Sequence, residues 1–98
     1  MIPKSELRTK NHLLKNGYYF IRSGRSFGVW DFVASNKKEI LFIQSKLRQM
    51  PSSEEMQRLR DFNNYPESGI VKRQIWLWKD GIREPRITDL SGVGNVSI

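Results

Sequence analysis

The stretch ILFIQSKL, residues 40–47, decides the fold because it begins as a core strand and ends in polar residues. Its first four residues are all apolar, which is typical of a strand buried on both faces of a sheet. Gln44, Ser45 and Lys46 follow without a turn signal, so the strand is predicted to continue through them. Because side chains alternate along a strand, Gln44 and Lys46 share one face. An amide and an ammonium at the end of a core strand need a partner or a function.

The preceding stretch, VWDFVA (residues 29–34), is predicted to be a strand that pairs with residues 40–47 as an antiparallel hairpin. A turn centred just after Lys37 gives paired residues whose numbers sum to 75. Asp31 then lies opposite Gln44, with Lys46 diagonal to Asp31 on the same face. Opposite Cβ atoms are about 5 Å apart and diagonal ones about 7–8 Å apart, so three polar groups would converge. A slip of one residue would send Asp31 to the other face.

Further elements are predicted on both sides of the hairpin. Helices are expected over residues 5–16 and 52–64, and strands over 18–23 and 73–81. Ser52 and Glu55 form a capping-box pattern at the start of the second helix, and Met56, Leu59 and Phe62 form its apolar stripe. The order α-β-β-β-α-β predicts an α/β domain with a mixed sheet. We expect one domain over residues 1–90 and a mobile tail over 91–98.

The amino-acid composition narrows the classes of function that the chain can have. The chain has 98 residues, 17 Lys and Arg against 10 Asp and Glu, and a net charge of +7. Such a charge favours polyanionic partners such as nucleic acid, although a generic basic surface would carry it too. The absence of cysteine excludes disulfides and thiolate metal sites. No stretch reaches the ~20 apolar residues of a membrane span, so we expect an intracellular protein without a membrane partner.

The polar cluster on the hairpin has two interpretations. Asp31 and Lys46 could pair with each other at the rim of the sheet. Alternatively, the carboxylate of Asp31 and the amide oxygen of Gln44 could hold a hard divalent cation such as Mg²⁺. The lysine would then orient a water nucleophile or stabilise charge on a phosphate.

The spacing of these residues resembles a known motif. Asp31, twelve residues, and then Gln44-Ser45-Lys46 resemble the D-(x)n-(D/E/Q)-x-K signature of the PD-(D/E)XK nuclease superfamily. The likeness is closest to the archaeal Holliday junction resolvases. In these, a helix with a glutamate precedes a glycine, an aromatic strand ending in Arg-Ser, and a Gly/Ser-rich loop. Glu6, Gly17 and YYFIRSGRSFG (residues 18–28) keep that order before Asp31.

The resemblance implies a restriction-endonuclease-like αβββαβ core with a mixed central sheet flanked by helices. It further implies an Mg²⁺- or Mn²⁺-dependent DNA endonuclease that cleaves phosphodiester bonds, with selectivity for structures such as Holliday junctions. Asp31, Gln44 and Glu6 would be the metal ligands, and Lys46 the fourth catalytic residue. This sequence departs from the motif at Trp30, where a proline is usual. It departs again at Gln44, where a carboxylate is usual, and this removes one negative charge from the site.

Basic residues around the motif are candidates for DNA binding. Arg22, Arg25 and Ser26 stand just before the aspartate strand, where arginine could clamp a phosphate in a bidentate manner. Lys10 and Arg48 would widen the basic surface. A solvated basic loop is the alternative for the first three residues.

Other interpretations stay open at this point. Glu6 could instead pair with Lys10 at i,i+4 on the helix surface. The runner-up function is a catalytically weak or inactive DNA-binding module that keeps the nuclease fold. We expect a homodimer with its interface near Trp76 or Trp78, acting in the cytoplasm or nucleoid. His12 is expected to have a surface or packing role.

Overall fold

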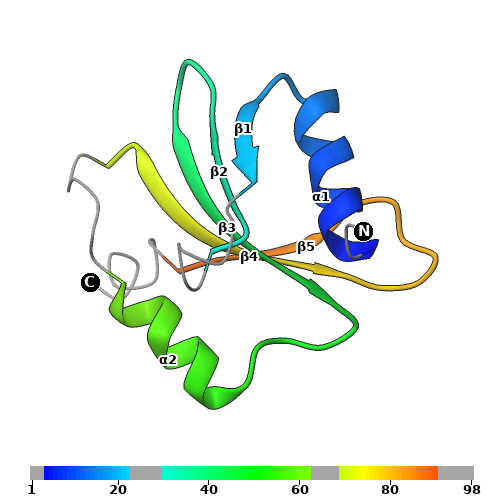
Figure 1. The fold of residues 1–98 in the computed structure, drawn as a ribbon, viewed down its shortest axis with the longest axis vertical. Helices are drawn as coiled ribbons and strands as arrows, with labels where there is room; N and C mark the ends of the chain where they lie inside the picture. The colour runs from blue at the N-terminus through cyan, green and yellow to red at the C-terminus, as the bar shows by residue number, and fades with distance from the viewer. Residues whose placement is uncertain (1–3, 23–29, 63–68, 91–98) are drawn as a thin grey trace.

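The computed structural model describes residues 4–22, 30–62 and 69–90, which form a five-stranded mixed sheet with two helices (Figure 1). In chain order the elements are α1 (Lys4–Lys15), β1 (Tyr19–Arg22), β2 (Phe32–Ser35), β3 (Ile40–Leu47), α2 (Ser53–Asp61), β4 (Val71–Trp78) and β5 (Arg86–Asp89). The strands lie in the order β1-β2-β3-β4-β5, and only β3 and β4 are parallel neighbours among them. The predicted α/β class with a mixed sheet is confirmed.

The hairpin of β2 and β3 has the predicted register. Phe32 pairs with Ile43, and the numbers of every pair in this ladder sum to 75. The backbone N–H of Asp31 donates to the carbonyl of Ile43 at 2.8 Å, which extends the pairing beyond the end of β2. Asp31 therefore lies at the end of the hairpin, where its N–H bonds to Ile43 and its side chain lines the same pocket as that of Gln44.

Asn36 holds the turn between these strands. Its Oδ1 accepts hydrogen bonds from the backbone N–H groups of Lys38 and Glu39 at 2.8 and 2.9 Å. Asparagine suits such turns because its short side chain satisfies the backbone locally. A short, internally bonded turn leaves little freedom for the strands to slip, which explains why the register could be predicted.

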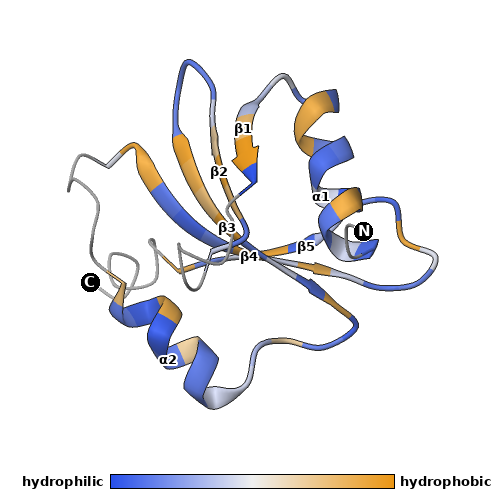
Figure 2. Ribbon diagram, in the orientation of Figure 1, coloured by the Kyte–Doolittle hydropathy of each residue, from blue (hydrophilic) through white to orange (hydrophobic). Residues whose placement is uncertain are grey.

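The two faces of the sheet are covered by different helices. α1 contributes Leu13 to one buried cluster, and α2 contributes Leu59 to the other. Figure 1 shows the two helices on opposite sides of the sheet, and Figure 2 shows hydrophobic stretches on the strands against a mostly hydrophilic α2. The first cluster contains Leu13, Phe32, Ala34, Leu41, Ile43, Trp76 and Trp78; the second contains Trp30, Leu59, Ile75 and Leu90.

The capping box of α2 is confirmed. Ser52 Oγ accepts from the backbone N–H of Glu55 at 3.2 Å, and the Glu55 carboxylate accepts from the N–H of Ser52 at 3.4 Å. Met56, Leu59 and Phe62 form the predicted inward face of the helix. Because Ser52 and Glu55 each accept a hydrogen bond from the other's backbone N–H, the start of the helix is fixed. Glu55 therefore has a defined position in the first turn.

The structure corrects one expectation about β4. Trp76 and Trp78 are only 3 % and 2 % exposed, because α1 covers them. The predicted subunit interface at these two residues is therefore wrong. His12 packs edge-on against Trp76, with ring centroids 5.3 Å apart, which confirms its packing role.

Other expectations are extended or left open. β5 was not predicted; it pairs antiparallel with β4 and forms one edge of the sheet. Neither α1 nor α2, the helices of the described residues, is long and apolar enough to cross a membrane. The division into a domain over 1–90 and a tail over 91–98 stays a prediction, because residues 91–98 lie outside the described part of the chain.

Candidate active site

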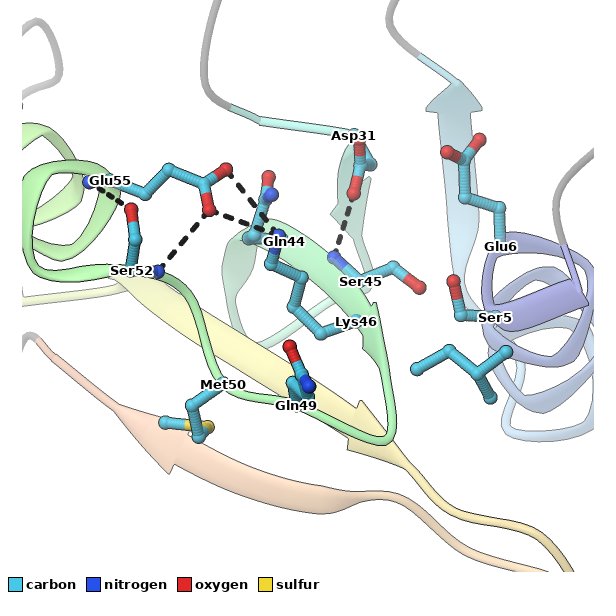
Figure 3. A pocket seen from close by; sticks show the side chains of 11 residues that line it. Ser5, Glu6, Asp31, Gln44, Ser45, Lys46, Gln49, Met50, Ser52 and Glu55 are labelled. Atoms are coloured by element: carbon cyan, nitrogen blue, oxygen red, sulfur yellow. Dashed lines mark hydrogen bonds and ion pairs between the residues drawn. The ribbon is translucent and has the colours of Figure 1, made fainter.

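An open pocket of about 530 Å³ lies where the site residues predicted from the sequence come together (Figure 3). Glu6 comes from the first turn of α1, and Asp31 directly precedes β2. Gln44 and Lys46 come from the end of β3. Glu55, from the first turn of α2, completes the polar side chains treated below. The pocket thus joins both helices to the end of the hairpin.

Asp31 is a partly buried carboxylate of the pocket. Its Oδ2 accepts a hydrogen bond from the backbone N–H of Ser45 at 2.7 Å, which fixes its orientation (Figure 3). Burial raises the pKa of the Asp31 carboxyl from 3.8 to about 6, because desolvation penalises the charged form. The hydrogen bond from Ser45 lowers this pKa and the nearby charge of Glu6 raises it. A cation at this position would relieve both the desolvation and the repulsion.

Gln44 provides the observation that tests whether a cation fits here. Its Oε1 is buried and accepts no hydrogen bond from any residue that the structure describes. An unsatisfied buried oxygen costs about 1–3 kcal/mol, so such atoms usually have a partner. An amide oxygen is a normal ligand of hard cations. The donor set of Gln44, Asp31 and Glu6 around one pocket therefore fits Mg²⁺ or Mn²⁺.

The donor set is poor in carboxylates. Within residues 4–22, 30–62 and 69–90, no three His, Cys, Asp or Glu side chains cluster closely enough to hold a metal by themselves. A cation in this pocket would thus depend on the amide of Gln44, which contributes no charge. Weak binding of divalent cations is the expected result.

Lys46 has a partner that the sequence did not predict. Its Nζ donates to Glu55 Oε1 at 3.1 Å and Oε2 at 3.4 Å, and this hydrogen bond lowers the pKa of Glu55. The alternative in which Lys46 satisfies Asp31 at the rim of the sheet is therefore wrong. The sequence marks Glu55 only as the second member of the capping box at the start of the second helix. It gives no separate signal that Glu55 contacts Lys46.

Glu6 also has a partner other than the expected one. Arg22 Nε donates to Glu6 Oε1 at 2.8 Å, so the ion pair joins α1 to the end of β1. The alternative pairing with Lys10 is wrong. The side chain of Glu6 is 17 % exposed and that of Arg22 is 44 % exposed. The guanidinium of Arg22 therefore retains contact with solvent.

The remaining candidate DNA-binding residues are only partly placed. Arg48 is exposed and paired in a bidentate manner with Asp80, at 2.9 and 3.2 Å. Lys10 lies on α1 and is partly exposed. Arg25 and Ser26 fall outside the described residues, so their predicted clamp is not placed. Arg22 does not line the pocket itself but contacts Glu6, which does.

Comparisons with known proteins support the fold. No family model matches the chain, and no curated protein matches it. Among solved structures, it is similar to Hjc of Archaeoglobus fulgidus, a Holliday junction resolvase from an archaeal hyperthermophile. The two share 22 % identity with a TM-score of 0.69, over 90 % of this chain and 76 % of that one. This likeness confirms the predicted αβββαβ core and the resemblance to archaeal resolvases in fold.

Proposed function

We propose that the chain is a metal-dependent deoxyribonuclease that cleaves phosphodiester bonds with Mg²⁺ or Mn²⁺, with selectivity for branched DNA such as a Holliday junction. The observation that carries the proposal is the buried, unsatisfied Oε1 of Gln44 beside Asp31 in one pocket. An apolar side chain would fill that space without the cost of an unpaired oxygen. A cation ligand is the function that accounts for both residues.

Each side chain of the pocket has a separate task in this proposal. Asp31, oriented by the N–H of Ser45, holds the cation with Gln44, and Glu6 assists directly or through water. The ammonium of Lys46 orients the attacking water and stabilises negative charge on the phosphate as the bond to it forms. The cation would polarise the phosphate oxygen and lower the pKa of a water molecule.

Phosphate binding is assigned to the basic residues outside the pocket. Arg22 contacts Glu6 through Nε, and its other guanidinium nitrogens have no hydrogen-bond partner within the described part of the chain, so it could hold a phosphate beside the cation. Arg25, Ser26, Lys10 and Arg48 stay in the proposal as further DNA contacts. We also propose an intracellular location and a homodimer, because a junction presents two equivalent strands to a small domain. The described residues do not locate its interface.

A catalytically weak or inactive DNA-binding module is the second candidate. It is favoured by Gln44, which supplies no charge to the metal site, and by the ion pairs that neutralise Glu6 and Lys46. Both candidates predict DNA binding, and only the first predicts cleavage that requires a divalent cation.

The first test is cleavage of labelled DNA by the full chain. Duplex, flap, single-strand and four-way junction substrates are incubated with Mg²⁺ or Mn²⁺, with and without chelator. We expect cleavage that the chelator abolishes and that Asp31→Asn lowers by at least about 100-fold, since removing a preorganised charged group typically costs that much. The amide introduced by this substitution keeps an oxygen for the Ser45 N–H, so the fold should persist.

The matched control is Asp61→Asn, the same chemical change at the exposed end of α2. It should leave cleavage unchanged. DNA binding without metal-dependent cleavage under any of these conditions would reject the nuclease and leave the binding module. Equal cleavage by Asp31→Asn and the wild type would reject the assignment of the site.

A further inference from the structure

Glu55 belongs to the pocket although its sequence position indicates only a helix cap. Its carboxylate lines the same cavity as Asp31 and Gln44, and both of its oxygens lie within 3.4 Å of Lys46 Nζ. Glu55 comes from α2, which covers one face of the sheet. Every second side chain of β3, that of Lys46 among them, lies on this face. Figure 3 shows the ammonium of Lys46 directed toward this carboxylate.

The carboxylate of Glu55 is itself oriented by a hydrogen bond at the start of α2. Its Oε1 accepts from the backbone N–H of Ser52, while Ser52 Oγ accepts from the N–H of Glu55. The bond from the backbone N–H of Ser52 restricts the carboxylate of Glu55 before any contact with Lys46 is made, and the Ser52 hydroxyl holds only the Glu55 backbone. A glutamate at the first turn is further favoured by the helix dipole. The lysine therefore meets a preorganised anion rather than a freely rotating one.

The energetics of this pair argue against a purely stabilising role. Lys46 and Glu55 are 26 % and 35 % exposed, so solvent screens their attraction. Such pairs contribute about 0–1 kcal/mol to folding. A lysine has four rotatable side-chain bonds, and fixing its ammonium costs entropy. What the pair gains is a defined position for the ammonium, at the mouth of the pocket.

We infer that Glu55 is a positioning residue that holds the ammonium of Lys46 in the geometry needed for DNA cleavage. This inference rests on the proposed nuclease function and adds a member to its site. Glu55 accepts hydrogen bonds from the ammonium, which has three protons and so keeps a donor for a ligand in the pocket. The bond from the backbone N–H of Ser52 links this geometry to the start of α2, so the helix backbone acts as the support of the site.

Three substitutions separate positioning from helix capping. Glu55→Met keeps the length of the side chain but removes every acceptor for Lys46. Glu55→Gln retains a neutral acceptor and still completes a capping box. Ser52→Ala removes the side-chain cap of α2 and leaves the Glu55 carboxylate available to Lys46. Cleavage kinetics, melting temperature and the side-chain ¹⁵N signal of Lys46 are measured for each variant, with Lys46→Met to assign the signal.

Positioning predicts that kcat does not follow stability. We expect Glu55→Met to lower kcat by roughly 10- to 100-fold, as for a misplaced catalytic group, with little change in KM. Glu55→Gln should retain an intermediate kcat, and Ser52→Ala a kcat near that of the wild type despite its lower melting temperature. The Lys46 signal should shift in Glu55→Met and stay in place in Ser52→Ala.

Several outcomes would overturn the role of Glu55. A kcat that falls in step with melting temperature in all three variants would mean that Glu55 only caps the helix. A rise in kcat in Glu55→Met would mean that the ion pair restrains the lysine, and a loss of Mn²⁺ affinity would make Glu55 a cation ligand instead. A wild-type chain that cuts no DNA would instead reject the nuclease itself, and the Lys46 signal would still report whether Glu55 holds the ammonium.

Discussion

Asp31 illustrates how much one residue depends on its surroundings. The sequence places it opposite Gln44, and the hairpin has the predicted register up to Phe32, the residue after Asp31. Its environment could not be predicted, because the hydrogen bond from Ser45 and the repulsion from Glu6 come from separate elements. Burial and the charge of Glu6 outweigh the hydrogen bond from Ser45, which lowers the pKa of Asp31, so this pKa is raised to about 6. This shift leads to a prediction of its own.

Cation binding should weaken as the pH falls through about 6. Below the raised pKa the Asp31 carboxyl carries a proton in the folded state, and a cation must displace it. Mn²⁺ affinity, measured by calorimetry, should fall about tenfold per pH unit below 6 for this single proton. Asp31→Asn should show weak, pH-independent binding. A wild-type affinity that is constant between pH 5 and 7 would contradict this prediction.

The same shift has a consequence for folding with a definite sign. Because the pKa of Asp31 is higher in the folded chain than in the unfolded one, the folded state retains a proton that the unfolded state loses above pH 4. The contribution of Asp31 to stability is therefore complete below about pH 4. It declines as the pH rises to about 6.

At the scale of elements, α1 is joined to the sheet by a buried hydroxyl. Thr9 is fully buried, and its Oγ1 accepts from Trp78 Nε1 at 2.9 Å. The same oxygen lies 3.0 Å from Ser45 Oγ and donates to the carbonyl of Ser5 at 2.9 Å. This cluster connects α1 to β3 and β4 one turn away from Glu6, so it fixes the helix that carries Glu6.

Two substitutions at Thr9 test the role of its hydroxyl in this connection. Thr9→Val keeps the shape of the side chain and removes its hydroxyl, leaving Trp78 Nε1 and Ser45 Oγ without this partner. We expect it to lower the free energy of unfolding by about 1–3 kcal/mol. Thr9→Ser keeps the hydroxyl and loses one methyl group, which costs about 1 kcal/mol. Urea denaturation measures both, and a smaller cost for Thr9→Val than for Thr9→Ser would refute the role of the hydroxyl.

The elements also show where sequence reasoning succeeded and where it failed. α2 was located by its capping box, and β3 was predicted with the bounds the structure gives, because strong local signals mark both. β5 was missed because it has four residues, only one of them apolar, and is partly exposed at the edge of the sheet. Trp76 and Trp78 suggested a subunit interface. An apolar sequence pattern indicates that a face of a strand is buried, but it does not indicate which element or subunit buries it. Here α1 covers it.

At the scale of the whole molecule, the net charge of +7 is the main driving force expected for DNA binding. Log K should fall linearly with log salt, with a slope near −0.9 for each phosphate contacted. Arg22→Ala should reduce that slope by about 1. Arg86→Ala removes the same charge from β5, at the opposite edge of the sheet, and should leave the slope unchanged. Equal slopes for all three chains, measured by fluorescence anisotropy with Ca²⁺ or without metal, would exclude Arg22 from the DNA contact.

The ion pair between Glu6 and Arg22 has a thermodynamic consequence for the order of assembly. A cation that draws on the charge of Glu6 leaves Arg22 without its anion, and a DNA phosphate is then the natural replacement. A phosphate on the other guanidinium nitrogens of Arg22 in turn competes with Glu6 for the charge of Arg22, which makes Glu6 more available to the cation. Metal and DNA should therefore bind with positive cooperativity. Because coupling is reciprocal, the factor by which Mg²⁺ raises DNA affinity must equal the factor by which DNA raises Mg²⁺ affinity. A weak metal site would then fill chiefly on the chains that already hold DNA.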